Sequence, residues 1–165
     1  MSSSSLYLVY GKTASEVATY RNGWGSAPPV WDWLRAQFLS EEVRPLFGDD
    51  KALWALARDE RVPVQWRMVH AFCFDWAVCP IARLADLADA CDYVGASLPD
   101  NGNVNHWPEI AAELRRHARR KDKRLQGISI GCTSVSDPWW DWDGGQEVFD
   151  CVAYATAPIN GARAA

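Results

Sequence analysis

The stretch that decides the fold is NHWPEIAAELRRHARRKDKRLQGISIGCTSVS, residues 105–136. Its first part predicts an amphipathic helix, because Pro108 stands in the first turn, where a missing N–H costs nothing. The apolar residues of this part recur at helical spacing: Trp107, Ile110, Ala111, Leu114 and Ala118. From 126 to 135, Ile128, Ile130 and Cys132 alternate with other residues, which predicts a strand on the core of the protein.

The rest of the chain predicts further strands and helices around this unit. Strands are expected at 6–10 and 147–155, and helices at 27–39, from 49 to about 62, and from 80 to about 95. Residues 68–75 form a continuous apolar run that fits a buried strand or a buried helix, and its short length with Phe, Val and Cys favours the strand. The expected fold is α+β (or α/β), with about four strands in one sheet and about four helices.

Composition and length predict a single globular domain. With 165 residues, 48% hydrophobic and 23% charged, the chain suits one hydrophobic core, which we expect over 6–157 with flexible tails at 1–5 and 158–165. No apolar run approaches the ~20 residues of a membrane-spanning helix, and the first residues do not form a signal peptide. Because the five cysteines form no metal-binding spacing with the three histidines, we expect reduced thiols, a cytoplasmic protein and no metal site.

Charge is distributed unevenly along the chain. Seven Lys and Arg residues lie in 115–124, whereas 125–161 has none and contains five acidic residues. The molecule should therefore be electrostatically two-sided. The basic run could contact phosphate or RNA, but cations also belong at a helix C-terminus, and the net charge of −4 disfavours direct nucleic-acid binding.

Two histidine-containing sets are candidates for catalysis. His70, Cys73 and Asp75 could form an activated nucleophile, but on a strand His70 would face away from the other two, which favours structural packing. His106, at a helix start, could instead meet Ser134 and Asp137 beyond the following strand, as in a small hydrolase or transferase. The structural alternative is that Asn105 caps the helix, Trp107 packs beneath it and His106 fills a surface turn.

The loop that follows the strand combines aromatic rings with acidic groups. Its three tryptophans and three aspartates within seven residues are Asp137, Trp139, Trp140, Asp141, Trp142 and Asp143. This composition is typical of a protein-binding hot spot. The same rings could stack on a sugar or close the edge of the core, and the carboxylates could bind a divalent cation, although nothing matches a calcium loop.

No cofactor is expected. Gly11-Lys12-Thr13 follows a strand as the end of a P-loop would, but Leu6 occupies the place of the first glycine of that motif.

Three motifs carry a resemblance to a known family. Residues 67–75 (with Phe-Cys-Phe-Asp), Asn105 to Pro108, and Cys132 to Pro138 resemble an uncharacterised family of small proteins of phages, prophages and plasmids. The resemblance implies a mobile-element setting and no activity. We therefore expect a small acidic protein-binding module, an anti-defence inhibitor such as an anti-CRISPR protein, whose partner is a host protein or complex with a basic surface. The alternatives are the hydrolase or transferase and a ligand or carbohydrate sensor, and the oligomeric state stays open.

Overall fold

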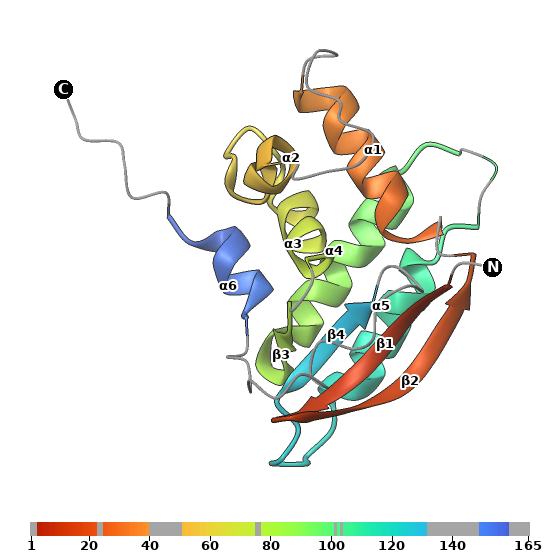
Figure 1. Ribbon diagram of the computed structural model, residues 1–165, viewed down its shortest axis with the longest axis vertical. Helices are drawn as coiled ribbons and strands as arrows, with labels where there is room; N and C mark the ends of the chain where they lie inside the picture. Colours follow the sequence, from red (N-terminus) through yellow and green to blue (C-terminus); the bar gives the residue numbers. More distant parts are fainter. Residues whose placement is uncertain are drawn as a thin grey trace.

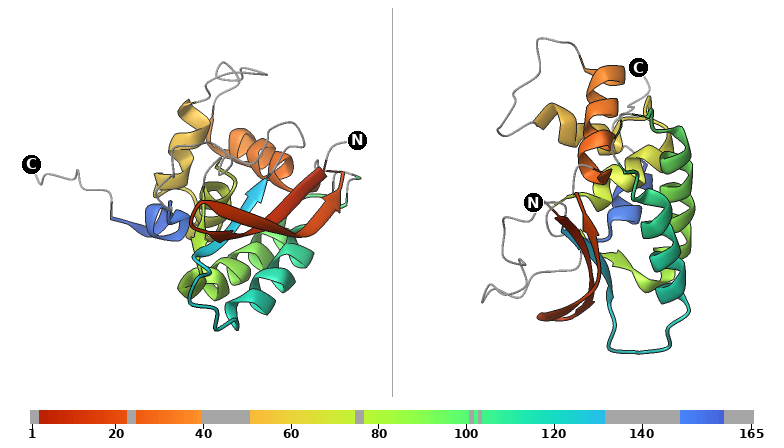
Figure 2. Two further views of the ribbon diagram at one scale, coloured as in Figure 1. Left: turned by 60° about the horizontal axis from the view of Figure 1, so that its bottom comes forward. Right: turned by 90° about the vertical axis from the view of Figure 1, so that its right-hand side faces the viewer.

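The protein is a four-stranded antiparallel sheet with helices packed on one face and at one end (Figure 1). The computed structural model describes residues 3–22, 25–39, 51–74, 77–100, 102, 104–131 and 149–158. The strand order is β2-β1-β4-β3. Figure 2 shows the sheet nearly edge-on in its right-hand view, with α4 and α5 side by side against one face. This confirms an α+β fold with a single domain.

Strands β1 (Ser3–Tyr10) and β2 (Thr13–Arg21) form a hairpin. Gly11 takes a φ of +68° in the turn, a left-handed conformation that glycine adopts without a steric penalty. The strand expected at 6–10 is confirmed but begins earlier, because residues 3–5, which we assigned to a flexible tail, pair with the end of β2. Strand β2 was not predicted, since most of its residues are exposed and it lies at the edge of the sheet.

The central strand β4 (Gly127–Gly131) confirms the strand predicted from the decisive stretch. It pairs with β1, placing Ile128 opposite Leu8 and Ile130 opposite Leu6, and it pairs with the short strand β3 (Cys79–Pro80) on its other side. All four of these apolar side chains are buried in one core. Their burial against α4 and α5 holds the sheet to its helical layer.

Three helices lie where the sequence predicts them: α1 (Ala27–Phe38), α4 (Leu84–Ser97) and α5 (Trp107–Ala118). The single turn η4 (Ile81–Arg83) leads into α4, and the predicted helix after 49 is α2 (Lys51–Ala55) continued by η3 (Leu56–Arg58). Across α4 and α5, Arg115 contacts Asp89 and Asp92 at 2.6 Å each. None of the helices described here combines the length and the apolar character that crossing a bilayer requires.

Two predicted strands are wrong. Residues 68–75 lie largely in helix α3 (Val64–Phe72), in which every residue from 68 to 72 is buried. Over 68–72 this helix exposes no residue, so this part of its sequence has no polar face that would show a helical period. Residues 147–155 lie partly in helix α6 (Cys151–Thr156), which begins where the Asp150 carboxylate accepts the Ala153 N–H at 2.9 Å. Asp150 is thus an N-cap, and its capping ends the extended chain at that point.

Candidate functional site

Of the predicted site residues, the structure describes His106. The others lie outside the described residues: Ser134, Asp137, Trp139, Trp140, Asp141, Trp142 and Asp143. The described residues on either side of this segment are fixed to the domain. Gly131 ends β4 opposite Ser5, while Phe149 forms a parallel bridge with Ala77 and its carbonyl accepts the Val78 N–H at 2.9 Å.

His106 is buried, with 5% of its surface exposed, and does not lie in the surface turn that we considered for it. Its Nε2 is 2.8 Å from the carbonyl oxygen of Arg21, at the end of β2. Its Nδ1 is 3.4 Å from a carboxylate oxygen of Glu109, one turn into α5. The ring also packs against Tyr20, with 5.3 Å between centroids.

These contacts determine what the imidazole of His106 can do. A carbonyl oxygen only accepts hydrogen bonds, so Nε2 must carry a proton. The Nε2 atom therefore cannot serve as a general base without breaking its bond to Arg21, and Nδ1 faces Glu109. The geometry is that of a histidine that links a strand to a helix.

The neighbours of His106 hold the same junction together. The Asn105 side chain accepts the Trp107 N–H at 3.1 Å and donates to the Gly95 carbonyl at 2.8 Å. The Trp107 indole is fully buried and donates to the Ser26 carbonyl at 3.0 Å. The predicted packing of Trp107 beneath the helix is confirmed. The N-cap position is occupied by His106 and not by Asn105 as predicted, although the Asn105 side chain accepts the N–H of the first helical residue. We refer to Asn105, His106 and Trp107 as the α5 clasp.

His70 and Cys73 are both buried in the core. Both lie in or at the end of helix α3, so the argument from opposite strand faces is wrong, but the conclusion that they pack in the core stands. His70 is fully buried, its Nε2 is 2.8 Å from the Leu53 carbonyl, and its ring stacks on Trp54 at 5.5 Å. Asp75 lies outside the described residues.

The described cysteines are four buried thiols: Cys73, Cys79, Cys91 and Cys151. A hydrogen bond with Cys151 and burial raise the pKa of Cys79, and burial raises the pKa of Cys91. Protonated thiols are poor nucleophiles and poor metal ligands. In the part of the chain described here, no three His, Cys, Asp or Glu side chains are placed to hold a metal ion.

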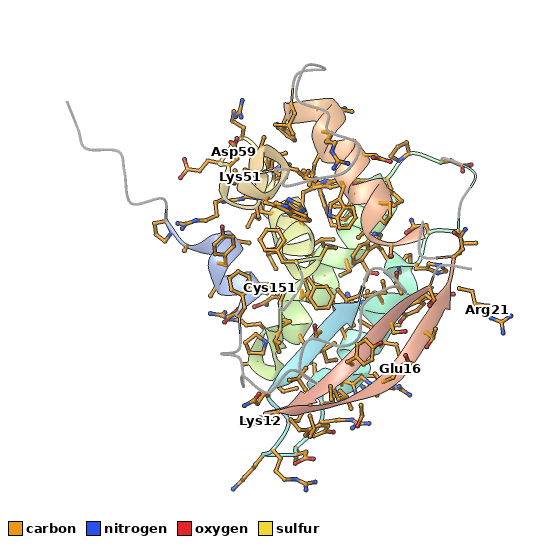
Figure 3. All side chains as sticks on the ribbon, viewed as in Figure 1. Lys12, Glu16, Arg21, Lys51, Asp59 and Cys151 are labelled. Atoms are coloured by element: carbon orange, nitrogen blue, oxygen red, sulfur yellow. The ribbon has the colours of Figure 1, made fainter. Side chains whose placement is uncertain are left out.

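Sequence reasoning missed a polar set on the hairpin strands β1 and β2. The Thr19 hydroxyl donates to the Glu16 carboxylate at 2.6 Å, and Ser5 donates to Thr19 at 3.3 Å. Hydrogen bonds from Thr19, Ser5 and Tyr7 lower the pKa of Glu16, which therefore stays ionised and accepts hydrogen bonds. Figure 3 shows Glu16 on this hairpin. The contact of Thr19 with Glu16 is local, but only the pairing of β2 with β1 brings Ser5 and Tyr7 to them, so the sequence offers no local signal for the whole set.

Comparison of the chain with protein-family models, with curated proteins and with solved structures gave no match.

Proposed function

We propose that this chain is a small acidic protein-binding module that inhibits a host complex by occupying a basic surface, as an anti-defence protein of a mobile element does. The observation that carries the proposal is the density of rings and carboxylates in 137–143, where three tryptophans and three aspartates stand within seven residues. Tryptophan is enriched in binding hot spots, and carboxylates complement Arg and Lys on a partner.

The described residues support binding over catalysis. His106 is the candidate catalytic residue of the hydrolase or transferase alternative. It is buried, and its Nε2 is hydrogen-bonded to the Arg21 carbonyl. A general base must reach the proton that it abstracts, and this imidazole is used to join β2 to α5. The resemblance to proteins of phages and plasmids remains a prediction, and it suggests a host defence complex as the partner.

The test is capture of a partner from host lysate by the tagged chain, followed by its identification and by measurement of the purified pair. The variant Asp141→Asn with Trp142→Ala should lower the affinity by at least about tenfold, because hot-spot truncations cost about 2 kcal/mol or more. Raising the salt concentration should slow association, since complementary charges steer it.

A matched control makes the test specific. Glu60→Gln with Tyr93→Ala likewise removes one carboxylate and one aromatic ring; both of these residues are exposed and lie far from 137–143 in the sequence. This control should bind the partner as tightly as the unmodified chain does. If no partner is captured, or if both double variants bind equally well, the proposal is wrong.

A further inference from the structure

Two segments far apart in the sequence meet beside the hairpin turn. The β1–β2 turn lies against the loop that joins α5 to β4, because the Gly11 N–H donates to the Gln126 side chain at 3.0 Å and the Gln126 N–H donates to the Val9 carbonyl at 2.9 Å (Figure 1). An open groove of about 720 Å³ lies at this junction. Its lining residues are Tyr10, Gly11, Thr13, Ser15, Arg124 and Gln126. We call this feature the basic groove.

Arg124 lines the basic groove, and further cations stand close in sequence to its lining residues in both segments. Helix α5 ends at Ala118, so Lys121, Lys123 and Arg124 lie beyond its last turn, where the helix dipole no longer accounts for them. Lys12 adds a charge from the hairpin turn and points away from the domain (Figure 3). The sequence showed one basic run at a helix exit, whereas the fold adds Lys12 to it.

Most of this charge is not neutralised within the protein. Arg124 pairs with Asp122 at 3.4 Å, and Arg116 pairs with Glu113 at 2.5 Å. On these two segments, five exposed cations have no carboxylate at ion-pair distance among the residues that the structure describes: Lys12, Arg119, Arg120, Lys121 and Lys123. Because like charges held close together repel, a bound polyanion would be stabilised here.

The other lining groups suit phosphate. Ser15 is exposed on the edge strand, and its hydroxyl can donate to a phosphate oxygen without adding charge, while the Thr13 hydroxyl donates to the Tyr10 carbonyl at 3.3 Å. Tyr10 presents a partly exposed ring on which a base could stack. A carboxylate-rich peptide would use the cations but not the ring.

We propose that the basic groove binds the sugar-phosphate backbone of a nucleic acid. The net charge of −4 works against this binding, which should therefore be weak and strongly dependent on salt. The proposal is independent of partner binding by 137–143, because the two surfaces use different residues. Substitutions in the basic groove therefore test nucleic-acid binding while the residues proposed for partner binding stay intact, and the reverse also holds.

The test is fluorescence anisotropy of the full chain with labelled single-stranded DNA, single-stranded RNA and duplex DNA of mixed sequence, at about 50 mM salt and above. Lys12→Gln, Lys121→Gln and Lys123→Gln combined should weaken binding at least tenfold. The negative slope of log K against log salt should become less steep by about 0.7–0.9 for each phosphate that the variant no longer neutralises. Binding of any of the three probes with these responses supports the proposal, and the preferred probe identifies the form of nucleic acid.

The control is Arg21→Gln, Arg61→Gln and Arg83→Gln, which changes the net charge equally with exposed residues of other elements. It should alter the affinity less than twofold, and circular dichroism should show that both variants are folded. Three results overturn the proposal: no binding at low salt, equal effects of the two triple variants, or displacement of the probe by polyglutamate as readily as by unlabelled DNA.

Discussion

The Nε2 of His106 lies 2.8 Å from the carbonyl oxygen of Arg21, and this bond joins the start of α5 to the end of β2, 85 residues away in the sequence. Replacing the imidazole by a methyl group leaves that carbonyl without its donor in a partly buried site. We expect His106→Ala to lower the free energy of unfolding by about 1–3 kcal/mol, the usual cost of an unpaired buried polar group. Urea denaturation followed by circular dichroism measures this change.

Glu109→Gln is the control for His106→Ala, because it removes the exposed carboxylate at 3.4 Å from Nδ1 and keeps the bond to Arg21. Its effect should stay below about 0.5 kcal/mol, as for most exposed ion pairs. Equal losses from the two variants would show that the Glu109 contact, and not the link to β2, stabilises the junction.

Gly25 lies against the α5 clasp so closely that a side chain does not fit. A Cβ there would stand 1.9 Å from the Val104 carbonyl oxygen and 2.8 Å from Cδ2 of His106. We expect Gly25→Ala to destabilise the protein by about 1–3 kcal/mol or more, because the backbone at Val104 must move. Thermal melting of the purified variant measures the effect.

Gly95→Ala provides the comparison for Gly25→Ala. Its Cβ would meet Trp107 Cβ at 3.1 Å and Pro108 Cδ at 3.2 Å, a tight fit that small shifts relieve. In helix α4 alanine also gains about 0.5–1 kcal/mol over glycine. The net change should therefore be much smaller than at Gly25, and a larger loss at Gly95 would contradict this interpretation.

The sequence predicts those elements that have one polar and one apolar face. Helix α5 and strand β4 are of this kind, since Ile110 and Leu114 face the core in the helix as Ile128 does in the strand. Helix α3 was not predicted because residues 68–72 are all buried, and β2 was not predicted because it is an edge strand with many exposed polar residues. A periodic pattern of polar and apolar residues shows which side of an element faces the core and which side faces solvent. Neither α3 nor β2 has the pattern that is usual for a helix or a strand.

The same reasoning accounts for what the sequence indicates about the candidate site. The contact of the Asn105 side chain with the Trp107 N–H at the start of α5 is local and could be predicted, whereas the burial of His106 depends on β2, whose existence was not expected. The basic groove likewise needs Lys12 and the α5–β4 loop to meet, which only the pairing of β1 with β4 brings about. Contacts between distant segments have no signature in residue spacing.

The thiols of Cys79 and Cys151 lie together where β3 approaches α6, and their hydrogen bond and burial raise the pKa of Cys79. We expect iodoacetamide to modify Cys73, Cys79, Cys91 and Cys151 slowly in the native protein and fully in urea, because all four thiols are buried and the raised pKa of Cys79 and Cys91 makes their thiolates scarce. Peptide mapping by mass spectrometry at successive times distinguishes the sites. Fast native labelling of Cys151 would mean that α6 detaches from the core without global unfolding.

His117 is fully buried on α5, and burial together with Arg120 and Arg116 lowers its pKa below the ordinary value of 6.5. The groups that face it are Glu113, at 3.5 Å, and Arg116, which donates to its Nε2 at 3.4 Å. The unfolded chain therefore binds a proton at a higher pH than the native state does. Stability should be intact above about pH 6.5 and should fall as the pH decreases from there toward the lowered pKa of the native state.

His117→Gln tests this pH dependence, because glutamine does not titrate. Between pH 7.5 and 5 the unmodified protein should lose stability with a slope of at most about 1.4 kcal/mol per pH unit for one proton. The carboxyl groups with lowered pKa values, Glu16, Asp59 and Asp122, titrate below this range and leave the comparison undisturbed. Urea denaturation at each pH gives the two slopes. Substitution of a buried residue also changes the absolute stability, so the informative quantity is the difference between the two slopes. Identical slopes would show that a group other than His117 causes the pH dependence.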